Sequence, residues 1–243
     1  RTRLSFISGI HELNGVPIEI DLNNLNLSRN ESLIDTFKMF DLYLDGLVFR
    51  TNKHEKLLTA SKYFNKPIIN ALSDLSHPCQ ILADFFTLNE IFKKDKLIIS
   101  WFGDVNNVLF SLIELSKLIP RIHLNIFTDK SLFSDVFKNL LSKNIQTKDK
   151  VCDKTVNMSD CIMTDVFTSM NDDYDNNKRE KLLPFQVNKN IISQMNDNAV
   201  FMHCLPANIG EEVTSDVINS NKSIILKQAY NRKVLQKGLI SWL

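Results

Sequence analysis

Short apolar segments rich in β-branched and aromatic residues alternate with longer amphipathic segments along the chain, and this alternation limits the fold more than any other feature of the sequence. The pattern is typical of βαβ units, in which a helix connects two parallel strands. We expect strands at 44–49, 67–71, 97–102, 123–127, 161–166, 199–203 and 223–226. We expect helices at 30–41, 54–63, 78–94, 106–118, 131–142, 189–195, 211–219 and 231–242. The sequence therefore predicts an α/β fold with central parallel sheets flanked by helices.

The longest of the internal helices, at 78–94, indicates a division into two lobes. It begins with Pro78, which suits the first helical turn because proline lacks the N–H group that would be unpaired there. Its apolar face consists of Ile81, Leu82, Phe85, Leu88 and Phe92. A charged stretch at 93–96 follows, and then a new strand begins. We therefore predict a first domain over 1–92, a second domain over 93–226, and a connecting helix between them.

Composition excludes several classes of function. The chain has 29 lysine and arginine residues against 28 aspartate and glutamate residues, so its net charge of +1 gives no field that attracts nucleic acid or an anionic membrane. No apolar run reaches the roughly 18 residues that a membrane span needs. Four cysteines are too few for a disulfide scaffold of this size. We expect a cytoplasmic protein that binds any anion locally.

Polar side chains gather where the expected strands end. They are Arg50 and Thr51; Ser76, His77, Cys79 and Gln80; Gly103, Asp104, Asn106 and Asn107; Asp165, Ser169 and Met170; and His203, Cys204, Leu205 and Pro206. Taken singly, each histidine is more often a satisfied buried side chain, and Cys204 an inert thiol, than a catalytic group. Open α/β sheets bind ligands at the carboxyl ends of their strands. The clustering therefore indicates a binding site there.

Two other kinds of site fit the sequence less well. His77 with Cys79 and His203 with Cys204 supply donor atoms that zinc accepts, but neighbouring residues on one strand point in different directions. The junction at 102–107 lacks both the three glycines of a dinucleotide site and a phosphate-loop lysine. The residues therefore favour neither a metal site nor a nucleotide site, and the helix N-terminus with Asn106 or Asn107 can instead hold a carboxylate.

Ordered motifs across the chain resemble one enzyme family. They are Arg1-Thr2-Arg3 before Leu4-Ser5-Phe6, Asp74-Leu75-Ser76-His77-Pro78-Cys79-Gln80, Gly103-Asp104-Val105-Asn106-Asn107, Asp165-Val166-Phe167-Thr168-Ser169-Met170, and His203-Cys204-Leu205-Pro206-Ala207. In order and approximate spacing they are similar to the motifs of the ornithine carbamoyltransferases. The resemblance runs from Arg1 to the terminal helix.

This resemblance implies a reaction, in which the δ-amine of L-ornithine attacks carbamoyl phosphate and gives L-citrulline and phosphate. It also implies two α/β lobes, with carbamoyl phosphate on the first and the amino acid on the second, and a helix at 227–243 that returns to the first lobe. Members of the family are usually homotrimers and need no metal or cofactor. The family serves arginine metabolism, and the sequence leaves the direction of flux open.

The resemblance assigns site residues by their match to the family motifs. Carbamoyl phosphate is expected to bind Arg1, Thr2, Arg50, His77, Gln80, Arg232 and the backbone carbonyls of Cys204 and Leu205. Forked guanidinium donors suit the phosphate oxygens of this dianion. Charge that develops on the carbonyl oxygen needs fixed donors, and Thr2, Arg50 and His77 match that role.

The amino acid is expected at the second lobe. By resemblance, Asn107 takes the α-carboxylate of ornithine, and Asp165, Ser169 and Met170 lie on the α-amine side. Asp165 and Cys204 are expected to hold the reacting amine and to assist its deprotonation. The catalytic residues predicted in this way are Arg50, His77, Asp165, Cys204 and Arg232.

Five features depart from the family pattern, and two of them are Val105 in place of a common glycine and Lys227-Gln228 in place of an acidic pair. The chain begins at the arginine of the family's phosphate loop, which predicts an N-terminally incomplete fragment that lacks an upstream strand and helix. Asn171 stands where the family has glycine, so loop closure over the amino acid is expected to change. Asn26 stands where a glutamine or histidine often reaches a neighbouring subunit.

Alternative functions stay open on the sequence alone. Aspartate carbamoyltransferases share the phosphate loop and the His-Pro element, but their amino-acid site needs additional arginines. Enzymes for putrescine or an N-acylated ornithine are nearer alternatives, and Asn107 favours a substrate with a free carboxylate. A non-catalytic homologue of this fold is the alternative from a different class.

Overall fold

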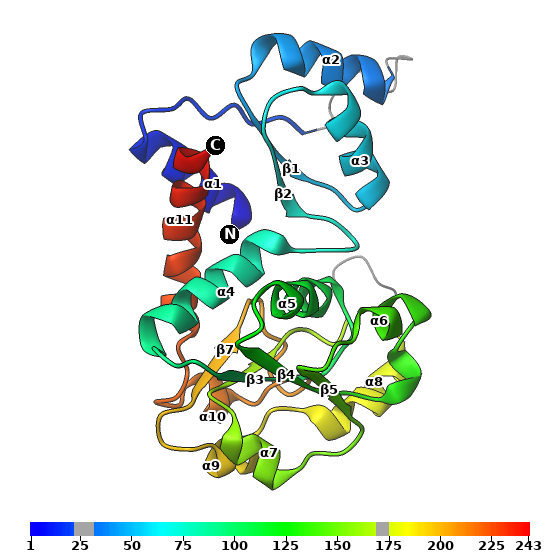
Figure 1. Ribbon diagram of the computed structural model, residues 1–243, viewed down its shortest axis with the longest axis vertical. Helices are drawn as coiled ribbons and strands as arrows, with labels where there is room; N and C mark the ends of the chain where they lie inside the picture. Colours follow the sequence, from blue (N-terminus) through cyan, green and yellow to red (C-terminus); the bar gives the residue numbers. More distant parts are fainter. Residues whose placement is uncertain (22–31, 169–174) are drawn as a thin grey trace. The chain divides into compact units, whose positions relative to one another are not determined.

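The computed structural model describes residues 1–21, 32–168 and 175–243 (Figure 1). Within these residues the chain forms two compact units, Arg1–Ala83 with Arg232–Leu243, and Asp84–Asn231. The divisions fall inside two helices, α4 (Pro78–Ile91) and α11 (Ile225–Trp242). The predicted domain boundaries, after residues 92 and 226, lie elsewhere, and that domain assignment stays a prediction.

The first unit contains a two-stranded parallel sheet of β1 (Leu47–Arg50) and β2 (Ile68–Leu72). Its helices are α1 (Thr2–Glu12), α2 (Leu33–Tyr43), α3 (His54–Tyr63), the first part of α4 and the last part of α11. Ser32 begins α2, because its hydroxyl accepts the N–H of Asp35 at 3.1 Å. Strand β1 pairs with β2 in register from Leu47 opposite Ile68.

Alternation of side chains along β1 and β2 gives this small sheet two apolar faces. Phe49 packs with Phe37 of α2 at a ring-centroid distance of 5.5 Å, and with Ala60 of α3. The opposite face contributes Ile69 and Ala71 to a cluster that includes the following side chains of α1, α4 and α11: Phe6, Cys79, Leu239 and Ile240. The sheet is therefore covered by helices on both faces.

The second unit contains a five-stranded sheet in the order β5-β4-β3-β6-β7, with all strands parallel. The strands are β3 (Leu97–Phe102), β4 (Ile122–Phe127), β5 (Ile145–Lys148), β6 (Cys161–Thr164) and β7 (Val200–His203). The helices are α5 (Asn107–Leu118), η2 (Lys130–Leu132), α6 (Asp135–Leu140), α7 (Asp153–Met158), α8 (Asn176–Leu182), η3 (Leu183–Phe185), α9 (Lys189–Gln194) and α10 (Ser215–Ile218). Helix α5 lies on one face of this sheet, and α7, α9 and α10 lie on the other (Figure 1).

Strand β3 is the point at which the order of this sheet reverses. The chain proceeds from β3 to β4 and β5 on one side and then returns to β6 and β7 on the other side. The carboxyl ends of β3 and β6 therefore flank the crevice where such sheets place their ligands. The α/β class with parallel sheets flanked by helices, predicted from the sequence, is confirmed.

Part of the apolar core of the second unit lies at the carboxyl ends of β4 and of β3, the strand at which the order of the sheet reverses. The rings of Phe102 and Phe127 stack at the ends of β3 and β4 with centroids 4.5 Å apart. Val156 of α7, Ile191 of α9 and Val217 of α10 pack into the same cluster. Apolar packing at the carboxyl ends of the strands fixes the positions from which the polar side chains project.

The structure corrects the expected positions of several elements. The strand expected at 223–226 is wrong: Ser223 makes an isolated bridge to Phe201, and helix α11 begins at Ile225. A short apolar run such as this one does not distinguish a strand from the start of a buried helix. Strand β5 and the helices α1, α7 and α8 were not predicted, because each is short or weakly periodic.

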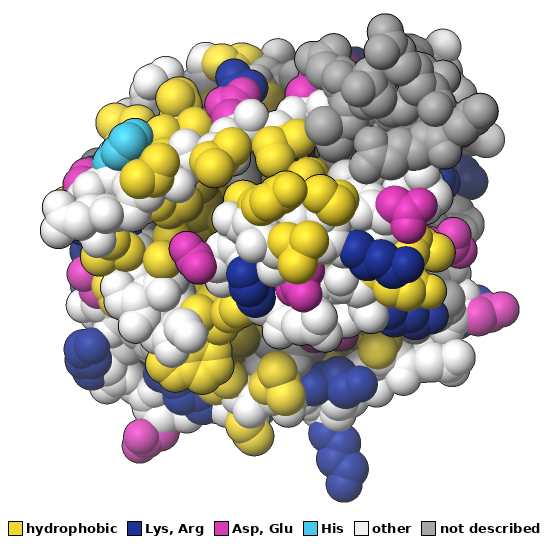
Figure 2. Space-filling model, turned by 90° about the horizontal axis from the view of Figure 1, so that it is seen from above, with side chains coloured by type: hydrophobic (Ala, Val, Ile, Leu, Met, Phe, Trp, Pro, Cys, Tyr) yellow, Lys and Arg dark blue, Asp and Glu magenta, His cyan; other side chains and the backbone are white. Residues whose placement is uncertain are grey.

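Apolar side chains are also exposed on the surface of the first unit. Val16 is 83% exposed and Tyr43 of α2 is 73% exposed. Figure 2 shows a face on which hydrophobic side chains lie among lysine, arginine and acidic ones.

The predicted homotrimer stays a prediction. Over the described residues, none of the helices combines the length and apolar character needed to cross a membrane.

Gly103 makes the turn that follows β3. Its φ is +114°, a backbone conformation that glycine adopts without a steric penalty. A Cβ atom at this position would be 2.8 Å from Cε1 of Phe167. Only glycine therefore allows the end of β3 to approach the segment after β6.

We predict that Gly103→Ala lowers the free energy of unfolding by about 2 kcal/mol or more, because it adds both backbone strain and a clash with Phe167. Chemical denaturation of the two proteins measures the change. Gly238→Ala is the control, since a Cβ atom there meets nothing within 4 Å in helix α11. It should be neutral or slightly stabilising, and an equal loss in both variants would contradict the interpretation.

Candidate functional site

Arg232 is the centre of a polar cluster in the first unit. The side chain lies in α11 and is only 6% exposed. Its Nη1 donates to Oε1 of Gln80 at 2.9 Å, and its Nη2 donates to Oγ1 of Thr2 at 2.6 Å. Nη2 also lies 3.2 Å from Nε2 of His77. The terminal helix therefore carries a guanidinium into contact with α1 and with the start of α4.

A second guanidinium reaches the same hydroxyl group. Arg50, the last residue of β1, donates through Nη1 to Oγ1 of Thr2 at 3.4 Å. Arg50 is exposed, and in the described part of the chain no carboxylate forms an ion pair with it. Arg1 immediately precedes Thr2 and is the N-cap position of α1. Guanidinium groups and a helix N-terminus together suit an anion with several oxygen atoms.

His77 is the neutral member of this cluster. Burial, together with the nearby charges of Arg232 and Arg50, lowers its pKa to about 3. Since a guanidinium can only donate, Nε2 of His77 accepts from Arg232 and the ring proton is on Nδ1. The imidazole therefore supplies one donor and one acceptor without adding positive charge.

This low pKa predicts a dependence of stability on pH. The pKa of His77 is lower in the folded protein than in the unfolded chain, so its contribution is complete above about pH 6.5 and is lost as the pH falls towards 3. Between pH 7 and pH 5 we expect the free energy of unfolding to fall by about 2 kcal/mol more in the native chain than in His77→Gln. Chemical denaturation at the two pH values measures both changes. Equal losses would show that His77 accepts a proton as readily when folded.

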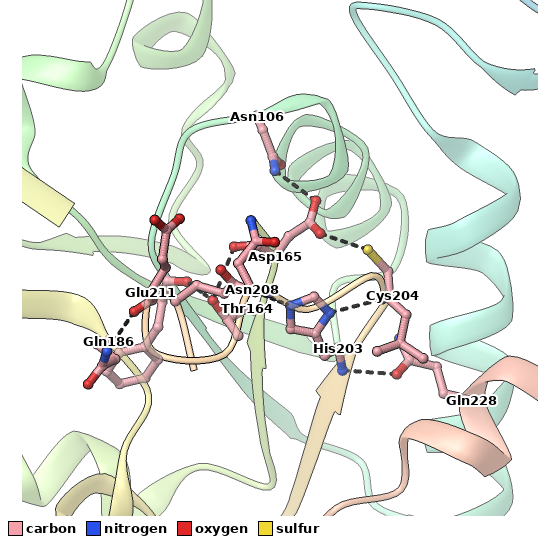
Figure 3. A network of polar contacts seen from close by, with 12 residues as sticks. Asn106, Thr164, Asp165, Gln186, His203, Cys204, Asn208, Glu211 and Gln228 are labelled. Atoms are coloured by element: carbon pink, nitrogen blue, oxygen red, sulfur yellow. Dashed lines mark hydrogen bonds and ion pairs between the residues drawn. The ribbon is translucent and has the colours of Figure 1, made fainter. Parts of the chain in front are cut away.

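Asp165, Cys204 and Asn106 form the polar cluster of the second unit (Figure 3). Asp165 follows β6, Cys204 follows β7, and Asn106 lies between β3 and α5. The Cys204 thiol donates to Oδ1 of Asp165 at 2.8 Å, and Nδ2 of Asn106 donates to Oδ2 at 2.9 Å. Each oxygen of the carboxylate therefore has a donor from a different strand end.

Asp165 is 6% exposed, and this burial raises the pKa of its carboxyl group. The hydrogen bonds from Cys204 and Asn106 oppose that rise but do not cancel it. Asn106 also caps α5, because its Oδ1 accepts the N–H groups of Val108 and Leu109 at 3.1 Å each. The cap fixes the amide, which must then present its NH₂ group to Asp165.

His203 and Glu212 hold the chain on either side of Cys204. Both side chains are fully buried, and Nε2 of His203 lies 3.0 Å from Oε1 of Glu212. Nδ1 of His203 accepts the N–H of Leu205 at 2.9 Å, so the ring proton is on Nε2 and is donated to Glu212. Glu212 also accepts the N–H of Asn208 at 2.6 Å. These hydrogen bonds therefore connect the loop after β7 to His203, the last residue of that strand.

The hydrogen bonds of His203 decide whether this cluster can bind a metal ion. Asp165, His203 and Cys204 place one possible ligand atom each within 4.8 Å of one another. Both ring nitrogens of His203 are already hydrogen-bonded, and its lone pair accepts from Leu205. A metal ligand needs that lone pair. The donor set of this cluster therefore does not fit a metal ion.

The structure brings together the predicted residues in two groups, one in each unit. Thr2, Arg50, His77, Gln80 and Arg232 form the first through hydrogen bonds. Asp165 and Cys204 form the second, and Leu205 follows directly with a φ of 58°. The roles assigned to these residues stay predictions.

Other site residues need separate comment. Asn107 is the first residue of α5 and is half-buried, whereas its neighbour Asn106 contacts Asp165. Ser169, Met170, Asn171 and Asn26 lie outside the described residues. Sequence reasoning assigned no role to Glu212 or Gln228. The sequence offered Asn106 beside Asn107 as a ligand for a substrate carboxylate, whereas the structure has its amide donating to Asp165 and capping α5.

A separate hollow of about 220 Å³ lies near the opposite edge of the five-stranded sheet. It is lined by residues at the amino ends of the strands, including Lys96, His123 and Asn144. None of the predicted site residues lines it. The hollow is therefore distinct from the cluster around Asp165.

Comparison with known families matches both parts of the chain. The family description "Aspartate/ornithine carbamoyltransferase, carbamoyl-P binding domain" matches residues 1–90. The description "Aspartate/ornithine carbamoyltransferase, Asp/Orn binding domain" matches residues 95–243. The chain is 39% identical over 255 residues to the ornithine carbamoyltransferase of Methanocaldococcus jannaschii, covering 100% of this chain and 83% of that protein.

Solved structures give the same picture. The ornithine carbamoyltransferase of Pyrococcus furiosus matches with a TM-score of 0.90 and 33% identity, over 99% of this chain and 79% of that one. An aspartate transcarbamoylase of Trypanosoma cruzi, solved with carbamoyl phosphate and aspartate, matches with a TM-score of 0.83 but 21% identity, over 99% and 79%. That second likeness shows the fold alone.

Proposed function

The chain belongs to the aspartate/ornithine carbamoyltransferase family of enzymes, and we propose that it transfers the carbamoyl group of carbamoyl phosphate to the δ-amine of L-ornithine. In this reaction the amine nitrogen bonds to the carbamoyl carbon. The bond from that carbon to the phosphate oxygen breaks, and phosphate leaves with the electron pair. The ornithine ammonium must lose a proton before its nitrogen can attack.

The cluster around Arg232 supports binding of carbamoyl phosphate by the first unit. Arg50 and Arg232 both reach Thr2, and their forked donors match phosphate oxygens. Arg1, at the N-cap position of α1, is a further candidate for the phosphate. Because His77 is neutral, the net positive charge comes from the arginines, and the imidazole is left to hydrogen-bond the carbonyl.

The pair of Asp165 and Cys204 is the observation that favours a cationic amino acid in the second unit. A buried carboxyl group beside a thiol attracts an ammonium group and repels a carboxylate side chain. Burial also raises the pKa of Asp165, which makes it a better proton acceptor than an exposed aspartate. This argues for ornithine over aspartate, and Asn107 remains our candidate for the α-carboxylate of ornithine.

The remaining parts of the proposal rest on the family. We propose that the backbone carbonyls of Cys204 and Leu205 accept from the carbamoyl NH₂ group, and that Gln80 does the same. A homotrimer in the cytoplasm, serving arginine metabolism, is the expected setting. Ser169 and Met170 complete the proposed ornithine site.

Substrate preference is the direct test of the proposal. Citrulline formation, followed by its colour reaction, should require both carbamoyl phosphate and L-ornithine. Carbamoyl transfer to aspartate or to putrescine, assayed through phosphate release, should be slower by about a hundredfold or more in kcat/KM, since neither substrate has both a free carboxylate and a distal ammonium group. Faster release of phosphate with aspartate or putrescine would overturn the assignment.

Cys204→Ala tests the amine-handling role. We expect kcat to fall by about a hundredfold, because the carboxylate of Asp165 loses its thiol partner and the amine loses a contact. Binding of carbamoyl phosphate, measured by calorimetry, should weaken less than about threefold. Cys152→Ser is the matched control, since Cys152 is an exposed thiol away from the cluster. Unchanged kcat in Cys204→Ala would refute the role.

A further inference from the structure

Gln228 is buried beside the end of β7 and belongs to none of the family motifs described above. It lies in the first turns of α11 and is 1% exposed. Its Oε1 accepts the backbone N–H of His203 at 3.0 Å, and its Nε2 donates to Oδ1 of Asp84 in α4 at 2.8 Å. One amide group therefore connects a strand end to a buried carboxyl group, and Figure 3 shows the contact with His203.

The chemistry of the two partners fixes the orientation of this amide. A backbone N–H can only donate, so the oxygen of Gln228 must face His203. The NH₂ group must then face Asp84, whose carboxylate accepts. Asp84 is itself only 2% exposed, so this carboxyl group has little access to water. Only this orientation lets one amide bond both the His203 N–H and Oδ1 of Asp84.

The N–H that Gln228 holds belongs to the residue just before Cys204. His203 is the last residue of β7, and its ring is fixed by Glu212 and by the N–H of Leu205. Gln228 therefore fixes the backbone of His203 while Glu212 fixes its side chain. Cys204 follows with its thiol donated to Asp165 at 2.8 Å.

We propose that Gln228 is a positioning residue, which holds the end of β7 against Asp84 so that the Cys204 thiol stays on the carboxylate of Asp165. Gln228 acts through the His203 backbone and touches neither reactant. The assignment rests on the proposed carbamoyl transfer for its effect on turnover. Its effect on the thiol itself is independent of that reaction.

Gln228→Leu tests the role by removing both hydrogen bonds at nearly constant volume. In a Cys152→Ser background, we expect iodoacetamide to alkylate Cys204 about threefold faster or more, because the thiol is released from Asp165. Buried Cys79 and Cys161 do not compete. We also expect kcat to fall about tenfold or more, with KM for carbamoyl phosphate within about twofold.

A matched control lies on the same helix. Gln236 is also fully buried in α11, and neither of its amide atoms has a hydrogen-bond partner within the described residues. Gln236→Leu makes the same chemical change without breaking a hydrogen bond. It should leave both the alkylation rate and kcat within about twofold of the parent protein.

Exchange of the hydrogen-bond donor and acceptor between residues 228 and 84 distinguishes a positioning role from a general loss of stability. Gln228→Glu places a second carboxyl group against Asp84 and should reproduce the defects of Gln228→Leu. In Gln228→Glu with Asp84→Asn, the asparagine amide donates to the introduced carboxylate, whose other oxygen still accepts from His203. We expect this double variant to recover kcat and the alkylation rate to within about twofold of the parent protein.

Three results would overturn the proposal. The first is unchanged alkylation of Cys204 in Gln228→Leu. The second is a double variant no better than Gln228→Glu. The third is a loss of kcat matched by Gln236→Leu, which would mark a general effect of changes in α11. If the parent protein forms no citrulline, the proposed function fails, while the alkylation rates still decide the role of Gln228. Melting temperatures within about 4 °C confirm that the variants fold.

Discussion

The polar chemistry of the second unit depends on a geometric constraint, because a parallel sheet brings the carboxyl ends of all its strands to one edge. Asn106, Asp165 and Cys204 are far apart in the sequence, but each follows a strand of the same sheet. The sheet order reverses between β3 and β6, which opens the edge where Asn106 meets Asp165. Apolar packing of Phe102 and Phe127 keeps that edge in place.

The polar clusters of the two units suit ligands of opposite charge. The first gathers guanidinium groups around Thr2 and keeps His77 uncharged by burying it, so its polarity suits an anion. The second buries the carboxyl group of Asp165 with a thiol and an amide, so its polarity suits a cation. Carbamoyl phosphate and ornithine differ in charge in the same way. This complementarity, rather than any single residue, links the geometry to the proposed reaction.

The fold class and many residues of the two polar clusters could be predicted from the sequence, because local patterns mark them. Strand periodicity and the Gly103 turn are local signals, and the site motifs stand at strand ends where ligands bind. Glu212 and Gln228 act through contacts that form only after folding, so no local pattern marks them. The segment at 223–226 misled the strand assignment, because an apolar run of that length also begins a buried helix.

The pair of guanidinium groups on one hydroxyl has a consequence for the stability of the folded chain. Arg50 and Arg232 repel each other across Thr2, and a bound dianion would replace that repulsion with attraction. Any ligand that binds only the folded chain raises the free energy of unfolding by an amount that grows with its concentration. An anion held between Arg50 and Arg232 would therefore protect the folded chain against unfolding, and so against proteases that cleave only the unfolded chain.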